Sequence, residues 1–168
     1  MRLSLIRSLA LAAALLPSAL QAQSPDGSVN IALRGLTAVM VVADSLPEGA
    51  AKAGLFASQM QTDVELRLRE AGITILPPTS APGSPVLYVQ ASLTGGESGL
   101  IAYSAHLTFG EAVRLVRVPT VLTFGTTWEG PRVLGYASTE HVAEQVRKAV
   151  NDQVSTFLNA WLAVNPRK

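Results

Sequence analysis

The stretch LYVQASLTGGESGLIAYSAHLTF, residues 87–109, decides the fold. Both of its halves alternate between two sets of side chains on either side of a glycine-rich turn, and such alternation indicates strands with one buried face. The apolar face carries Leu87, Val89, Ala91, Leu93, Ile101, Tyr103, Ala105, Leu107 and Phe109. The opposite face carries Tyr88, Gln90, Ser92, Ala102, Ser104, His106 and Thr108. The pattern predicts two neighbouring strands with one wet face.

Two amphipathic helices flank this stretch. Ser58-Gln59-Met60-Gln61 fits a capping box, and the helix that it predicts runs to about Ala71. A longer helix, capped by Ser138 or Thr139, is predicted to end at Asn165-Pro166. Its apolar stripe holds Val142, Val146, Val150, Val154, Phe157 and Trp161. Helices with such stripes must cover the apolar face of the strands.

The remaining segments complete one domain. A strand within IALRGLTAVMVVADSL, from Ile31, is apolar on both faces and is expected to be central. Residues 73–76 predict a short strand, 77–85 a proline-rich connector, 121–128 a further strand, and 133–136 a short return after a turn at Gly130-Pro131. The expected fold is α+β, a two-layer sandwich with a mostly antiparallel sheet of about five strands and two helices on one face, in the order β-α-β-β-β-β-α.

The first residues are typical of a secretory signal peptide. Arg2 and Arg7 precede an Ala/Leu run at residues 9–16, and PSALQA at 17–22 has the helix breaker and small residues of a cleavage site. The run is too short for a permanent bilayer span. We therefore predict a signal peptide at 1–22, a flexible leader at 23–30 and a single domain at 31–165. The expected location is the periplasm or the exterior, with no transmembrane span in the mature chain.

Composition excludes several classes of function. The chain has no cysteine, which excludes disulfides, thiol chemistry, thiolate metal sites and the lipid-bearing cysteine of lipoproteins. Removal of the signal peptide takes two arginines with it and leaves a nearly neutral domain. No basic footprint for nucleic acid remains.

Few residues suggest chemistry. Ser104 and His106 share a strand face, which raises the hypothesis of a hydrolase, but no GxSxG elbow surrounds the serine. His106 and His141 have no metal-ligand spacing, and Glu111 and Glu129 are two carboxylates near strand ends whose convergence the sequence leaves open. We expect no catalytic constellation, cofactor or metal.

Two kinds of binding are left open. The polar face of the sheet, with Tyr88, Gln90, Ser92, Ser104, His106 and Thr108, suits an envelope protein or polymer, and a plain solvated face is the alternative. The second hypothesis is a small-molecule carrier, with a pocket between sheet and helices near Tyr103, Phe109, Trp128 and Trp161. The leading hypothesis is an exported, non-enzymatic binding or scaffold domain.

The order of elements, with a last helix of the VRKAVNDQVSTFLNAWL type, resembles the small periplasmic α+β domains of the curli-secretion channel family and of lipoprotein activators of peptidoglycan synthases. The segments QTDVELRLREAGITIL, TTW and FLNAWLAVNP also resemble parts of exported bacterial proteins with no assigned function. The resemblance covers nearly the whole mature chain and implies an envelope protein. It carries no functional residue over to this sequence.

Overall fold

The computed structural model describes residues 30–95 and 99–166, and the predicted signal peptide lies outside these ranges. Six strands and two helices follow one another, with the short 3-10 helices η1 (Asn30–Leu33) and η2 (Ala51–Ala53) before α1. The elements are β1 (Ala38–Ala43), α1 (Ala57–Ala71), β2 (Thr74–Ile75), β3 (Val86–Gly95), β4 (Leu100–Leu115), β5 (Val118–Glu129), β6 (Val133–Ser138) and α2 (Val142–Val164).

The strands form one mixed sheet, in the order β2-β1-β3-β4-β5, with β6 also paired to β4. β1 is central, as predicted, but it runs parallel to both β2 and β3, whereas β3, β4, β5 and β6 pair in antiparallel fashion. The expectation of a mostly antiparallel sheet of about five strands is therefore corrected to a mixed sheet of six. The parallel pairs arise because α1 and the proline-rich connector each carry the chain back before the next strand begins.

β5 and β6 share one side of β4. β3 pairs with β4 residues 101–110 on one side, so β5, at β4 residues 108–115, and β6, at 100–105, occupy the other side end to end. The predicted short return after Gly130-Pro131 is therefore wrong in direction. The strand is interrupted at residues 130–132, and β6 then continues in the direction of β5 along the same edge of β4.

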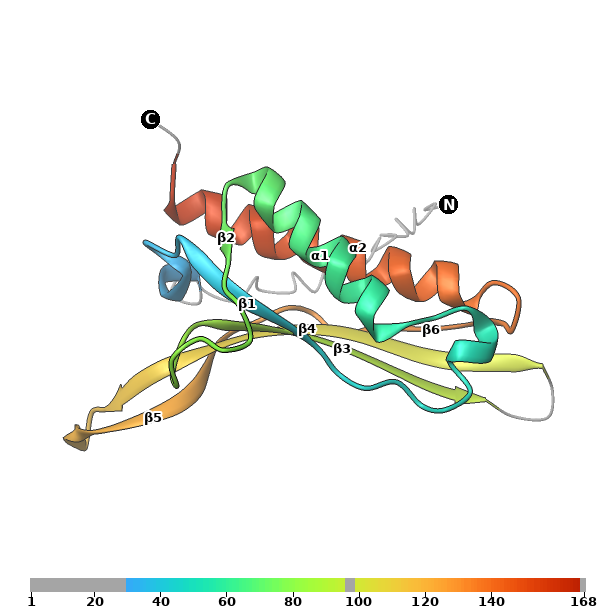
Figure 1. Cartoon of the computed structure of the whole chain (residues 1–168), viewed down its shortest axis with the longest axis horizontal. Helices are drawn as coiled ribbons and strands as arrows, with labels where there is room; N and C mark the ends of the chain where they lie inside the picture. Colours follow the sequence, from blue (N-terminus) through green and yellow to red (C-terminus); the bar gives the residue numbers. More distant parts are fainter. Residues whose placement is uncertain (1–29, 96–98, 167–168) are drawn as a thin grey trace, which may run out of the picture.

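Both helices lie on one face of the sheet (Figure 1), as expected. The core between the two layers is centred on Phe109 of β4 and Phe157 of α2, which are both fully buried. The ring of Trp128 meets Phe157 edge to face, with centroids 5.1 Å apart. The hairpin register pairs Leu87 with Phe109 and so confirms the predicted apolar face.

Polar contacts join the helices to each other and join α2 to the start of the domain. Arg147 of α2 donates to Asp63 of α1 at 2.7 Å. Near the end of α2, Trp161 Nε1 donates to the carbonyl of Leu36 at 2.9 Å, and the Asn165 side chain both donates to the Leu33 carbonyl and accepts from the Gly35 amide. The first and last described segments are thus held together.

The predicted helix caps are wrong in detail. α1 begins at Ala57, and neither it nor α2 has a side-chain hydrogen bond from its N-cap residue. The N-cap of α2 is His141, and Ser138 contacts that histidine ring at 2.9 Å instead of capping the helix. Both C-termini lie within one residue of their predicted positions, because Gly72 adopts the left-handed conformation and Pro166 follows Asn165.

Candidate functional site

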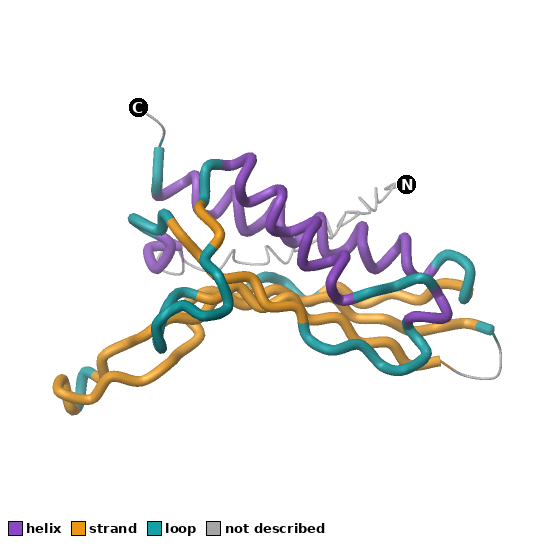
Figure 2. The backbone as a smooth tube through the Cα atoms, viewed as in Figure 1, coloured by secondary structure: helices purple, strands orange, loops and turns teal. Residues whose placement is uncertain are grey.

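The sheet face turned away from the helices is the predicted binding face, and we call it the open face. Figure 2 shows that the helices cover only the opposite side of the sheet. All six predicted residues lie on the open face, because the register pairs Tyr88 with Thr108, Gln90 with His106, and Ser92 with Ser104. The structure does not leave the six equally accessible.

His106 is only 3 % exposed, although it was expected to be part of a solvent-facing strip. Its Nε2 lies 3.0 Å from a carboxylate oxygen of Glu129 and 3.2 Å from the carbonyl oxygen of Gly130. Its Nδ1 lies 3.3 Å from a guanidinium nitrogen of Arg132. An imidazole with its single proton on Nε2 donates to the two oxygens and accepts from the arginine. The ring is enclosed by the segment that joins β5 to β6.

This geometry gives no support to the hydrolase hypothesis. Among the described residues, Ser104 makes no hydrogen bond to His106, and both ring nitrogens already have other partners. A general base needs a free nitrogen within hydrogen-bond reach of its nucleophile. Glu111 and Glu129 do not converge either. Glu129 pairs with Thr108, and Glu111 lies three residues after Thr108 in β4, so the two carboxylates belong to opposite faces of the sheet.

The break between β5 and β6 is fixed from both faces of the sheet. On the open face, His106 contacts Gly130 and Arg132. From the helix side, the buried Gln153 of α2 donates through Nε2 to the carbonyl of Pro131. A Cβ at Gly130 would lie 2.5 Å from Gln153 Oε1, so a larger residue there would displace that buried side chain. The sequence does not by itself predict this role of Glu129, Arg132 and Gln153; Gly130-Pro131 within an otherwise strand-like segment was the available signal.

The other end of the open face carries an exposed surface that we call the open patch. Cross-strand pairing places Ser92, Ser104 and Leu134 in one row, and Thr94, Ala102 and Tyr136 in the next. Leu134 is 73 % exposed and Tyr136 is 78 % exposed. β6 pairs with β4 alone among the described strands, so its outer backbone edge is unpaired. The patch therefore combines apolar and hydroxyl side chains beside a free strand edge.

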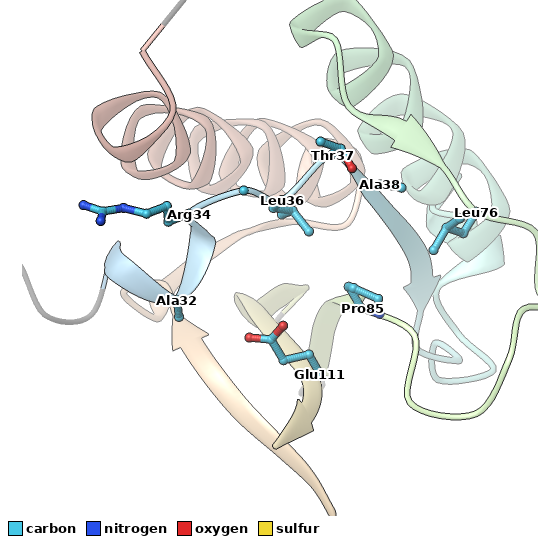
Figure 3. A pocket seen from close by; sticks show the side chains of 9 residues that line it. Ala32, Arg34, Leu36, Thr37, Ala38, Leu76, Pro85 and Glu111 are labelled. Carbon is cyan, nitrogen blue, oxygen red and sulfur yellow. The ribbon is translucent and has the colours of Figure 1, made fainter. Parts of the chain in front are cut away.

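A cleft of about 300 Å³ lies between η1, the start of β1, the residue before β3 and the outer part of β4. Leu36, Leu76 and Pro85 form its apolar walls, and the Glu111 carboxylate points into it while the Arg34 side chain extends away (Figure 3). Glu111 also accepts a hydrogen bond from the Thr127 hydroxyl at 3.0 Å. One partnered carboxylate does not make a convergent polar site.

The aromatic positions predicted to line a carrier pocket fill space instead. Phe109 and Trp128 both contact Phe157, and Trp161 is 8 % exposed with its indole hydrogen-bonded. The Tyr103 ring lies against Gly135, where a Cβ would be 2.6 Å from it. None of these four side chains lines the cleft described above. Within residues 30–95 and 99–166, no three metal-ligating side chains gather either.

These features define an α+β domain with one uncovered sheet face. No family model matches the chain, and none of the curated proteins matches it. Among solved structures, a minor lipoprotein from Acinetobacter baumannii is similar at 13 % identity and a TM-score of 0.35, covering 77 % of this chain and 95 % of that one. An uncharacterized protein is similar at 10 % identity and a TM-score of 0.40, covering 79 % and 92 % of the two chains.

A third similar structure is a dodecamer of a PelC variant from Paraburkholderia phytofirmans, at 12 % identity and a TM-score of 0.38, covering 76 % of this chain and 87 % of that one. Likeness at this level carries no class of protein, functional residue or activity over to this chain. The specific resemblance to the curli-secretion channel family and to lipoprotein activators stays a prediction. In the described part of the chain, neither helix has the length and hydropathy that crossing a bilayer requires.

Proposed function

We propose that this protein is an exported, non-enzymatic binding or scaffold domain of the cell envelope, and that the open patch contacts a protein partner. The observation that carries the proposal is the exposure of Leu134 and Tyr136 side by side on an uncovered sheet face. Large apolar side chains that gather on a surface are typical of interaction sites, and tyrosine is enriched in such sites.

The surroundings of these two side chains favour a polypeptide as partner. Ser92, Thr94 and Ser104 supply hydroxyl groups that both donate and accept hydrogen bonds. The outer edge of β6 offers backbone amides and carbonyls in the spacing that an added strand requires. A partner segment that lies along β6 would therefore bond to the backbone and cover Leu134 and Tyr136.

Photo-crosslinking tests this proposal. A photoreactive phenylalanine analogue is placed at Tyr136, in cells that produce the protein, and the matched control carries it at Leu66 of α1, which is 54 % exposed on the helix layer. We expect a discrete protein adduct from position 136 and none from position 66. Equal adducts at both positions, or none at either, would contradict the assignment.

A second variant tests the energetics of the contact. Leu134→Ser combined with Tyr136→Ser removes the apolar surface without touching a buried side chain, and Leu66→Ser is its control. We expect the double variant to lose the partner in a pull-down and the control to retain it. A co-purified small molecule in native mass spectrometry, with no protein partner, would favour the carrier hypothesis instead.

A further inference from the structure

The outer part of the β4–β5 hairpin extends beyond the body of the sheet, and we call residues 111–125 the arm. β3 stops pairing with β4 at Gly110, and beyond a hydrogen bond from the Ala112 amide to the Gly83 carbonyl the arm continues as two strands. Figure 1 shows it projecting past the ends of both helices. Every residue of β5 from Val118 to Phe124 is exposed, whereas residues 111–113 and Leu115 of β4 are half-buried.

The arm is unusually apolar for an exposed segment. Of the twelve exposed large hydrophobic side chains in the described chain, five lie within nine residues here: Val116, Val118, Val121, Leu122 and Phe124. Val116, at the turn, is 96 % exposed. Val118, Val121, Leu122 and Phe124 are 43, 42, 59 and 46 % exposed. The apolar surface therefore extends along β5 and the turn of the arm.

Beyond Glu111 at its base, the arm carries only positively charged side chains. Arg114 and Arg117 are the charged residues between Glu111 and Glu129, and both are exposed. Arg114 donates to the Pro119 carbonyl at 3.1 Å, and neither arginine forms an ion pair with a described residue. Elsewhere in the described chain acidic side chains outnumber basic ones. The tip is thus cationic on a body of the opposite sign.

We infer that the arm tip docks on an anionic lipid bilayer, with the tip side chains in the headgroup layer and the two guanidinium groups against lipid phosphates. An apolar tip that carries two guanidinium groups complements an anionic headgroup layer in both charge and polarity. Cross-strand pairing of β4 with β5 satisfies backbone groups that face inward in the arm, and the outward groups can bond to water and headgroups in that layer. The arm is a separate surface from the open patch, and this inference goes beyond the proposed function.

Vesicle flotation tests the inference at low ionic strength. A chain that begins at Gln23 is mixed with vesicles of phosphatidylglycerol and phosphatidylcholine in equal parts, or of phosphatidylcholine alone. We expect flotation with the anionic vesicles only. Each arginine near an anionic surface contributes about fivefold to partitioning, so Arg114→Gln with Arg117→Gln is expected to weaken it about 25-fold.

The control variant has the same charge change elsewhere. Arg34→Gln with Lys52→Gln removes two exposed basic groups that have no ion pair among the described residues, and we expect partitioning within about twofold of the parent. Val116→Asp is expected to abolish flotation, and circular dichroism checks that the fold is intact. Val116→Trp is expected to shift its emission to shorter wavelength with anionic vesicles, against the constant signal of the buried Trp128 and Trp161.

Three outcomes would overturn the inference. The first is equal flotation with both kinds of vesicle, and the second is an equal loss for the arm and control variants. The third is the absence of flotation together with a sedimentation coefficient that rises with protein concentration and falls in Val116→Asp, since this would show that the arm binds a second copy of the chain.

Discussion

Gly130→Ala tests how the break between β5 and β6 is fixed. The added Cβ would lie 2.5 Å from Gln153 Oε1 and 3.0 Å from the ring of Trp128, and real Cβ atoms do not approach other atoms as closely as the first of these distances. Gln153 must move, and because it is 2 % exposed it has little room to do so. We expect the free energy of unfolding to fall by about 2–3 kcal/mol, from the lost hydrogen bond to Pro131 and from overpacking.

The assay is urea unfolding followed by tryptophan fluorescence, which reports Trp128 directly. Gly49→Ala is the control, since nothing lies within 4 Å of its added Cβ and its φ is not positive, and we expect a change below about 0.5 kcal/mol. Combining Gly130→Ala with Gln153→Ala should cost at least about 1 kcal/mol less than the sum of the two single changes, because Gln153→Ala removes the side chain that the new Cβ would crowd. Additive effects, or equal values for Gly130→Ala and Gly49→Ala, would refute the reasoning.

Three further predictions concern α2. Trp161→Phe should lower the free energy of unfolding by about 1–2 kcal/mol, because a buried carbonyl loses its donor, and urea unfolding measures this; no change would show that this hydrogen bond does not stabilise the contact of α2 with the segment before β1. Asp63→Ala should cost only about 0.5–1 kcal/mol, since its ion pair with Arg147 is partly exposed, and a mutant cycle with Arg147→Ala should recover a coupling of that size. The hydrogen bond to Asp152 raises the pKa of Lys148, so Asp152→Asn should lower that pKa in an NMR titration, and an unchanged value would show that the pair does not form in solution.

The periodicity of residues 87–109 was sufficient to predict the hairpin, both of its faces and the helix layer, because alternation of side chains follows directly from strand geometry. The double-faced apolar pattern of residues 38–43 likewise predicted a central strand. The parallel pairing of β1 with β3 was not predictable in this way, since strand direction depends on how the connector crosses the sheet. The shared face of the six predicted residues could be predicted from the sequence, but the exposure of each side chain could not. The six are Tyr88, Gln90, Ser92, Ser104, His106 and Thr108.

The burial of His106 depends on residues more than twenty positions away. Glu129 lies at the end of β5, opposite Thr108, and Arg132 reaches the ring from the segment after Gly130, where Gln153 of the last helix bonds to Pro131. The exposed arm was missed for a similar reason. The apolar residues of 118–124 have the pattern of a buried strand, but they stay exposed because the arm extends past the helix layer (Figure 1).

The contacts between the end of α2 and the segment before β1 also constrain the order of assembly. Trp161 and Asn165 bond to backbone groups of Leu33, Gly35 and Leu36, more than 120 positions earlier in the chain. A polypeptide that emerges from a narrow channel with its N-terminus first therefore cannot close this domain until its last helical turn has emerged. β1 can pair with β3 earlier, but the contacts that α2 makes with the segment before β1 wait for the whole chain. Closure of the domain thus depends on residues far apart in the sequence, and such long-range contacts form late in folding.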